Sequence, residues 1–250
     1  MTDLFSRTEL LVGPAGMARL AAANVAVFGV GGVGSWCAEG LVRSGVEHLT
    51  LVDSDVVSVT NINRQAMADS LTVGRPKVEA LRDRLLAINP SASIEAIRKI
   101  YCDETAAYFD LDSFDAVVDC IDSLKDKITL IMRASASSAR FYSALGAGLK
   151  VDPTKVRVAE FWSVRGCPLG SALRKKMRRE GKEPAKPFLC VYDDEVLPNL
   201  GESSEAPGQS GGSTTKAVIN GTMAHITAIF GFTLAGLVIS DILKNTLSGR

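Results

Sequence analysis

The sequence contains few of the residues on which metal sites and disulfide frameworks depend. Its 250 residues include five cysteines and two histidines, and no two cysteines form a CxxC pair. This spacing argues against the common zinc sites, and cysteines scattered in this way do not form the framework of a small secreted domain. We therefore expect a protein of the reducing cytoplasm.

Net charge and long apolar runs are also lacking. Lys+Arg and Asp+Glu number 28 each, so the molecule as a whole has no field that attracts polyanions. The start, MTDLFSRTELLVG, lacks the apolar core of a secretory signal. The apolar stretch within 222–243 is about fifteen residues long, short of the roughly 20 that a bilayer span needs. We expect it to form a buried or dimer-interface helix and no stable membrane span, although hydropathy alone would assign one, and peripheral membrane association through 222–243 stays open.

Short apolar runs alternate with segments of helical periodicity. In the segment 74–90, for example, Val78, Leu81, Leu85 and Ile88 fall on one face of a helix. Such alternation predicts an α/β fold, Rossmann-like and doubly wound, in which helices flank a mainly parallel sheet. The strands are expected at 25–30, 48–53, 93–100, 114–122, 141–148 and 155–162.

The second half of the chain is less regular. We expect a single domain over 1–250, with a nucleotide-binding core in 1–150 and a substrate-side, C-terminal extension in 151–250. Within this extension, GESSEAPGQSGGSTTK (201–216) is too polar and glycine-rich to pack and is predicted to be a mobile loop. The apolar helix follows this loop.

A glycine cluster follows the first expected strand. Gly29, Gly31, Gly32 and Gly34 lie in VFGVGGVGSWCAEGLVRSG, where they let the backbone turn sharply and let a phosphate approach the N-terminus of a helix. Asp53, at the end of the second strand, is placed to bind a ribose hydroxyl. These features fit a nicotinamide dinucleotide, a flavin and ATP equally well.

The segment DSDVVSVTNINRQ (53–65) is not typical of a dehydrogenase. It places Asn61 and Arg64 directly after the second strand, and GRPK places Lys77 at the start of the next helix. A hydride-transfer site does not need these cations, whereas attack on the α-phosphate of ATP builds negative charge that cations stabilise. The pattern favours nucleotidyl transfer, with a solvated polar loop as the alternative.

Two aspartates end the fourth expected strand in VVDCIDS. Asp119 and Asp122 lie at the carboxyl edge, where open α/β sheets bind ligands. A carboxylate there can hold Mg²⁺ on a triphosphate together with several waters. Asp122 is the magnesium candidate, and a helix N-cap is its alternative role.

A basic segment interrupts the overall neutrality. Between Arg174 and Lys186 seven Lys or Arg stand against two Glu. Leu169, Leu173 and Met177 share one helix face, so the helix can pack there and present cations on the other face. Since Lys and Arg bind RNA phosphates without sequence preference, an RNA contact is predicted, with a solvated helix face as the alternative. The candidate RNA-binding residues are Arg174, Lys175, Arg178 and Arg179.

The motifs GxGGxGS, DxDxVxxxNxNRQ, GxPK and DxxDS, in this order over residues 5–150, resemble the ThiF-like family of ATP-dependent adenylating enzymes. This family includes ubiquitin-activating enzymes and the bacterial activators of thiamine and molybdopterin sulfur-carrier proteins. The strand DPTKVRVAEFW, the basic helix, the FLCVYDDE segment and the apolar tail more closely resemble its branch of bacterial tRNA threonylcarbamoyladenosine dehydratases.

The resemblance implies ATP and Mg²⁺ as cofactors and tRNA as the partner. It also implies a homodimer, because Arg7 in FSRTELLVG matches an arginine that reaches the partner's ATP. Asp122 would hold the metal and, with Arg7, Arg64 and Lys77, take part in catalysis. The residues implied to bind ATP are Gly29, Gly31, Gly32, Gly34, Asp53, Asp55, Asn61, Arg64 and Lys77.

The implied reaction is attack of a substrate carboxylate on the α-phosphate of ATP. In the tRNA dehydratases that carboxylate belongs to the threonylcarbamoyl group of an adenosine next to the anticodon, and an atom of the same group then displaces AMP and closes a ring. No enzyme nucleophile is needed. The tail VINGTMAHIT lacks the cysteine that some of these dehydratases carry, and catalytic roles for Cys167 and Cys190 stay open.

Other functions fit the sequence less well. An activator of a sulfur-carrier protein ending in Gly-Gly stays open, although the zinc-binding CxxC pairs of that branch are missing. A nucleotide-binding adaptor without turnover does not explain why Arg64, Lys77 and Asp122 occur together. A nicotinamide oxidoreductase leaves the NINRQ segment unexplained and has no placed acid or base for hydride chemistry.

Overall fold

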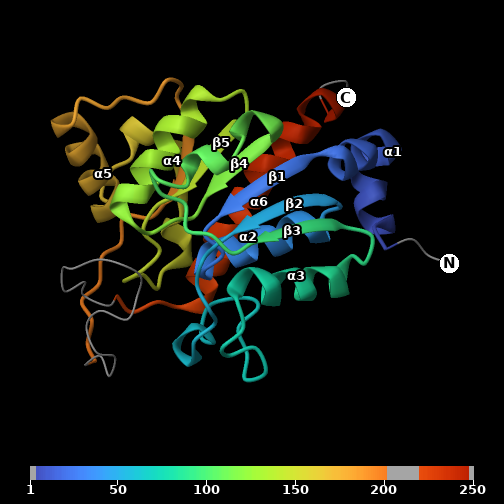
Figure 1. The fold of residues 1–250 in the computed structure, drawn as a ribbon, viewed down its shortest axis with the longest axis horizontal. Coiled ribbons are helices and arrows are strands. Elements are labelled where there is room, and N and C mark those ends of the chain that lie inside the picture. Colours follow the sequence, from blue (N-terminus) through green and yellow to red (C-terminus); the bar gives the residue numbers. More distant parts are fainter. Residues whose placement is uncertain (1–3, 202–219, 248–250) are drawn as a thin grey trace.

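The computed structural model describes residues 4–201 and 220–247, and their centre is a seven-stranded sheet in the order β3-β2-β1-β4-β5-β7-β6 (Figure 1). All neighbouring strands are parallel except β6, which runs antiparallel to β7 at the edge. The predicted doubly wound α/β fold is confirmed. The strands are β1 Asn24–Phe28, β2 His48–Val52, β3 Ser93–Ile97, β4 Ala116–Asp119, β5 Arg140–Ala144, β6 Arg157–Glu160 and β7 Leu189–Tyr192.

Helices cover both faces of the sheet. In β1, Val25 and Val27 pack with α2, α3 and α6, while the alternate residues Ala26 and Phe28 pack with α4 and α5. Because successive strand side chains point to opposite faces, a strand buried on both sides is apolar throughout. The helices are α1 Ser6–Ala22, α2 Gly32–Arg43, α3 Lys77–Ile88, α4 Leu124–Ala136, α5 Pro168–Arg179 and α6 Ala224–Leu247.

The strand order places a crevice at the end of β1. From β1 the chain passes to β2 on one side and later reaches β4 on the other, so the order reverses between β1 and β4. Such a switch point opens a crevice at the carboxyl ends of the strands. Gly29 lies at this point, where its N–H donates to Val52 O, and Cys120 N donates to Phe28 O.

The helix α6 crosses α2 at short range because glycines lie at the contact. A Cβ on Gly231 would lie 2.6 Å from Val33 O, and one on Gly40 would lie 3.0 Å from the Cβ of Ala235. Apolar side chains four residues apart bury the same face of α6, namely Ile226, Phe230, Leu234 and Val238.

The expected apolar helix is present as α6, and its 24 residues extend beyond the uninterrupted apolar stretch. Its segment Ala224–Lys244, with a mean hydropathy of 2.0, is long and apolar enough to cross a membrane by length and composition. In the molecule α6 packs against α1, α2 and β5. These contacts bury 44% of the segment, which fits a helix with one packed face, and a dimer interface for its other face stays a prediction.

Three further features differ from the expectations. Both α1, bent at Gly13 where φ is 72°, and the four-residue strand β7 were not predicted. The expected strand 155–162 is limited to β6, since Phe161–Ser163 forms a 3-10 turn, η5. The predicted mobile loop 201–216 lies outside the described residues, apart from Gly201.

Candidate functional site

The glycine turn between β1 and α2 forms the floor of the crevice. Gly29 has φ of 85°, and a Cβ there would lie 2.7 Å from Cys120 O. A Cβ on Gly34 would lie 1.9 Å from Gly29 O, so only glycine fits at either position. Gly31 is the N-cap residue of α2, and no side chain caps the helix there, which leaves the first N–H groups of the helix available to an anion.

The space above Gly31 suits a polar ligand. The nearest atom to a Cβ built on Gly31 is Gln65 Nε2, 3.9 Å away. Gln65 is only 6% exposed, and within the described part of the chain its Oε1 has no hydrogen-bond partner. A buried, unpaired polar atom costs free energy, so its position beside this open cradle fits a bound nucleotide.

Asp53 connects the glycine turn to the end of β2. Its Oδ2 accepts a hydrogen bond of 2.9 Å from Val30 N, and its Oδ1 accepts one of 2.9 Å from Asp55 N. Burial raises the pKa of Asp53, and the charge of Lys77 acts in the opposite direction. The carboxylate lies at the crevice, as its predicted ribose contact requires, and it also holds the turn, a role that the sequence did not reveal.

Lys77 occupies the first turn of α3 and faces the same edge. Its Nζ pairs with Asp55 Oδ2 at 2.7 Å, and its side chain is 9% exposed while that of Asp55 is 54% exposed. Asp55, predicted to contact the nucleotide, thus holds the ammonium group in the structure. A nearly buried cation with one exposed carboxylate partner retains attraction for phosphate.

The segment after β2 is held in place by its own hydrogen bonds. Asn61 Oδ1 accepts from Ser58 N, which completes a capping box around the 3-10 turn η1 Val59–Asn61. Arg64 lies against the glycine turn, since a Cβ on Gly32 would be 3.5 Å from Arg64 Cγ. Its NH1 donates to Thr60 O at 2.8 Å.

Two residues that sequence reasoning missed fix the backbone of Arg64. Trp36 Nε1 in α2 donates to Arg64 O at 3.0 Å, and Thr227 Oγ1 in α6 shares its hydrogen between Ala224 O at 3.0 Å and the same Arg64 oxygen at 3.3 Å. No spacing in the sequence indicates this junction, because the three residues are brought together only by the packing of α6 on α2.

The two aspartates after β4 have different environments. Asp119 is fully buried, where Lys127 Nζ lies 2.8 Å from its Oδ2 and Ser143 Oγ donates to it at 2.7 Å. Asp122 is exposed at the crevice. The alternative role of Asp122 as an N-cap is wrong, because Ser123 caps α4.

A metal at this edge would have few protein ligands. Within 4–201 and 220–247 no group of three His, Cys, Asp or Glu is placed to hold an ion. Mg²⁺ commonly takes one or two carboxylates and completes its shell with water and phosphate. The exposed carboxylate of Asp122 fits that mode of binding.

Arg7 lies far from the crevice of its own chain. The helix α1 precedes β1 and lies at the amino edge of the sheet, whereas the glycine turn is at the carboxyl edge (Figure 1). Arg7 is exposed on α1, close to Leu10 and Leu11, which are 87% and 71% exposed. A contact between Arg7 and a nucleotide therefore requires a second chain.

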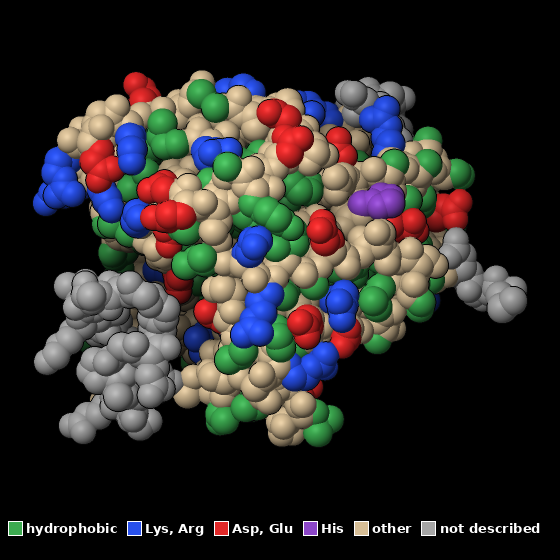
Figure 2. Space-filling view, in the orientation of Figure 1, with side chains coloured by type: hydrophobic (Ala, Val, Ile, Leu, Met, Phe, Trp, Pro, Cys, Tyr) green, Lys and Arg blue, Asp and Glu red, His purple; other side chains and the backbone are tan. Residues whose placement is uncertain are grey.

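The basic helix α5 packs on the predicted face, with Leu173 and Met177 fully buried. The RNA-binding prediction for Arg174 is wrong, because this residue is 8% exposed and its NH1 donates to Phe161 O. Arg174 follows the buried Gly170 by four residues and therefore shares the packed face. Lys175, Arg178 and Arg179 are exposed, and Figure 2 shows Lys and Arg side chains gathered over α5, with acidic groups beside them.

The cysteines of the second half are poorly placed for nucleophilic chemistry. Cys167 and Cys190 are both fully buried. Burial raises the pKa of the Cys190 thiol, so little thiolate forms at neutral pH. The arrangement favours a role in packing for both.

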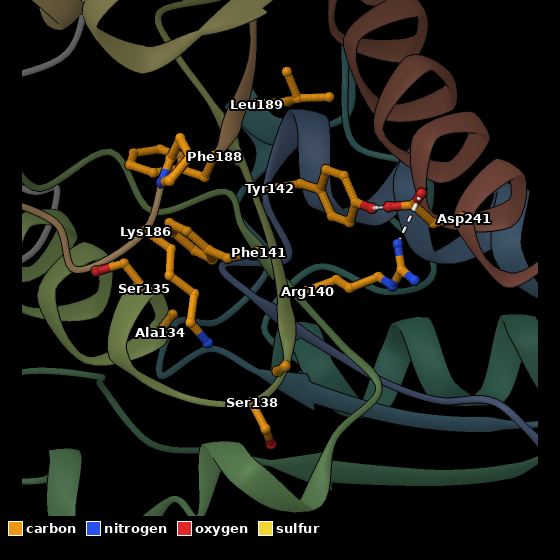
Figure 3. Close-up of a pocket in the computed structure, with 12 residues that line it drawn as sticks. Ala134, Ser135, Ser138, Arg140, Phe141, Tyr142, Lys186, Phe188, Leu189 and Asp241 are labelled. Atoms are coloured by element: carbon orange, nitrogen blue, oxygen red, sulfur yellow. Dashed lines mark hydrogen bonds and ion pairs between the residues drawn. The ribbon is translucent and has the colours of Figure 1, made fainter.

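A cavity of about 300 Å³ lies away from the crevice (Figure 3). It is bordered by the end of α4, the start of β5 and the segment 186–189. In Figure 3 the Tyr142 hydroxyl and Arg140 both point toward Asp241 of α6, which accepts a hydrogen bond from the former and pairs with the latter at 2.9 Å. Since this cavity is at the amino end of β5, it is separate from the glycine turn.

Comparison with known proteins places the chain among adenylating enzymes by sequence and by structure. The ThiF family pattern matches residues 5–248. A Bacillus subtilis tRNA threonylcarbamoyladenosine dehydratase is 35% identical over 98% of this chain and 96% of its own. The crystal structure of Escherichia coli tRNA N6-threonylcarbamoyladenosine dehydratase, TcdA, in complex with ATP has a TM-score of 0.84 at 28% identity, covering 98% of this chain and 96% of that one. An Escherichia coli molybdopterin-synthase adenylyltransferase is 34% identical over 55% of this chain and 54% of its own.

Proposed function

The chain belongs to the ThiF family, and from this premise we propose that it adenylates a carboxylate on tRNA with ATP and then dehydrates the product. The carboxylate is that of a threonylcarbamoyl group on the adenosine next to the anticodon. The second step closes this group into a ring. AMP and pyrophosphate are the other products.

The observation that carries this proposal is the extent of the similarity. The likeness to the Bacillus subtilis dehydratase spans 98% of this chain, including the basic helix and the apolar tail, whereas the likeness to the molybdopterin-synthase adenylyltransferase spans 55%. The carrier-protein alternative therefore accounts for only half of the chain.

The chemistry follows from the charges around the crevice. When the substrate carboxylate attacks the α-phosphorus, a new P–O bond forms and the bond to pyrophosphate breaks, so negative charge builds on the phosphate oxygens. Arg64 and Lys77 would stabilise that charge, and the first N–H groups of α2, where no side chain caps the helix, would add to their effect. Asp53 keeps the glycine turn in the conformation that receives the phosphates.

Ring closure needs no nucleophile from the protein. An atom of the same threonylcarbamoyl group attacks the activated carbonyl, and AMP leaves with the former carboxylate oxygen. The oxygen lost from the substrate thus ends in AMP, which accounts for the net loss of water. This route agrees with the burial of Cys167 and Cys190.

Metal binding and dimerisation belong to the same proposal. Mg²⁺, when bound, would neutralise phosphate charge, and Asp122 is the residue that would hold it. A homodimer would bring Arg7 of one chain to the crevice of the other, with the exposed Leu10 and Leu11 buried between the chains. The activity is assigned to the cytoplasm, and Lys175, Arg178 and Arg179 are assigned to tRNA phosphates.

The test is incubation of the purified protein with Mg-ATP and tRNA that carries threonylcarbamoyladenosine. Mass spectrometry of the released nucleosides, under conditions that preserve the ring, should show the loss of one water, dependent on ATP and matched by AMP. Lys77→Ala serves as the chemical control and should release no AMP. An unchanged nucleoside mass, with ATP–pyrophosphate exchange only when a Gly-Gly carrier protein is added, would reject the proposal in favour of the alternative.

A further inference from the structure

A tryptophan and two guanidinium groups lie together where η5 meets α5. Trp162 is partly exposed, and the guanidinium carbon of Arg178 lies 5.1 Å from the centroid of its ring. Arg165 NH1 donates to Trp162 O at 2.8 Å and to Val164 O at 2.9 Å. These bonds hold the Arg165 guanidinium next to the tryptophan.

The cations of this cluster lack acidic partners. Within the described ranges no ion pair is formed by Arg165 or Arg178, whereas Arg179 and Lys182 on the same surface both pair with Glu180. Burial lowers the pKa of the neighbouring Arg174, and the charges of Arg165 and Arg178 lower it further. The Glu160 carboxylate accepts a hydrogen bond from Trp162 N at 2.8 Å but forms no ion pair with Arg165 or Arg178 in the described ranges. The like charges of the two arginines therefore repel each other, and a bound anion would relieve that repulsion.

We propose that Trp162, Arg165 and Arg178 form a stacking subsite for an unpaired nucleotide of the RNA substrate, an inference that rests on the proposed function. The base stacks on the indole and the guanidinium plane, and its flanking phosphates bind the two arginines. Aromatic rings and guanidinium planes are the surfaces on which proteins stack unpaired bases. Arginine also binds phosphate through two parallel hydrogen bonds.

The cluster begins at the amino end of β7, where Phe161, the residue before Trp162, donates its N–H to Phe188 O, and it extends toward the carboxyl end of the same strand. Gly166 follows Arg165, and a Cβ on Gly166 would lie 2.5 Å from the Cβ of Asp194, just beyond the end of β7. The Arg165 end of the subsite therefore lies at the carboxyl edge of the sheet, the edge that carries the glycine turn. An acidic protein would also be attracted by the arginines, but RNA offers both phosphates for the arginines and a planar base for the indole and the guanidinium plane, so the observations favour RNA.

Binding measurements test the subsite without requiring turnover. The probe is a single-stranded oligonucleotide with an anticodon-loop sequence, compared with a fully paired duplex of the same sequence. Trp162→Ala should weaken binding of the single strand about tenfold and leave duplex binding nearly unchanged. Quenching of tryptophan fluorescence by the single strand should disappear in Trp162→Phe, a variant that retains an aromatic ring for packing.

Two charge variants distinguish a specific contact between Arg178 and the RNA from general attraction of the RNA by the positive charge of α5. Arg178→Gln should weaken single-strand binding and reduce its dependence on log salt by about one ion. The matched control is Lys182→Gln, which removes the same charge from a cation that is paired with Glu180 and should change the affinity less than about twofold.

Two results would overturn the subsite. One is equal single-strand affinity and equal quenching in the wild type and in both Trp162 variants. The other is full competition by poly-glutamate at equal charge, which would assign the cluster to an acidic protein. The failure of the proposed function gives a different result, in which the oligonucleotide still quenches Trp162 but modified tRNA is not dehydrated.

Discussion

Lys127 and Asp119 form an ion pair in which neither side chain has exposed surface. The ammonium group also donates to Ile121 O at 2.9 Å, and the carboxylate accepts from Ser143 and Ile121 N. Both charges are thus paired and hydrogen-bonded, the condition under which a buried pair is tolerated. The pair supports the loop that leads from β4 to Asp122.

Removing one partner of this pair should destabilise the fold strongly. We expect Lys127→Met to lower the free energy of unfolding by about 3 to 5 kcal/mol, because it leaves an uncompensated buried carboxylate. The double variant Lys127→Met with Asp119→Asn should recover most of that loss. Denaturant unfolding measures both values, and a single variant as stable as the double one would contradict the prediction.

The residue types in the sequence indicated which residues line the crevice, but they did not indicate which residues hold those side chains in place. Gly29, Gly34 and Lys77 occupy the crevice as their motifs indicated. Trp36 and Thr227 were missed because both bind a backbone carbonyl, an acceptor that every residue carries. The ligand contacts assigned to Asp53, Asn61, Arg64 and Asp122 stay predictions.

Among the elements, the segments after β5 and β7 are joined by one carboxylate. Glu195 accepts hydrogen bonds from Asp152 N at 3.0 Å and Val151 N at 2.6 Å, and Lys155 Nζ lies 2.9 Å from it. The two backbone N–H groups and then the Lys155 ammonium lower the pKa of Glu195 to about 2. The charged form is therefore the one that holds these segments together.

This pKa gives a pH dependence with a definite sign. Because the pKa of Glu195 is lower in the folded chain than its ordinary value of 4.5, the stabilisation is fully present above pH 4.5 and is lost as the pH falls toward 2. The difference in unfolding free energy between the wild type and Glu195→Gln should shrink over that window. The prediction would be contradicted if this difference in unfolding free energy, measured by denaturant unfolding, stayed constant within experimental error between pH 6 and the lowest pH at which the protein is folded.

Most elements were predicted, but the helix α1, which is bent at Gly13, and the short strand β7 were missed. The face of α5 that carries Leu173 and Met177 packs as its spacing indicated. The strand β7 is only four residues long, too short for a pattern of period two to be distinguished from a loop. The error at Arg174 came from residue type, since a guanidinium is expected in solvent even where helical spacing places it on the packed face.

At the scale of the whole molecule, α1 and the crevice lie at opposite edges of the sheet (Figure 1). A site completed by Arg7 of a second chain can be tested by mixing two inactive variants. In a dimer of one Arg7→Ala chain and one Lys77→Ala chain, one of the two sites has both residues intact. Random exchange of chains should therefore restore about a quarter of the wild-type AMP release.

The outcome distinguishes the two possible arrangements of Arg7. If Arg7 acted within its own chain, every site in the mixture would lack one residue and no activity would return. If Arg7 had no role, Arg7→Ala would be active alone. Size-exclusion chromatography of each variant, before and after mixing, is the control for chain exchange.

The sequence by itself determined the fold class, the glycine turn and the residue types around it. These depend on local rules, namely the alternation of apolar runs, the steric freedom of glycine and the placement of residues at the ends of strands. Tertiary structure alone decided that Thr227 of α6 lies against Arg64, that Lys127 is buried with Asp119 and that Arg7 lies at the far edge of the sheet. Each of these depends on contacts between segments far apart in the chain, and no local spacing encodes such contacts.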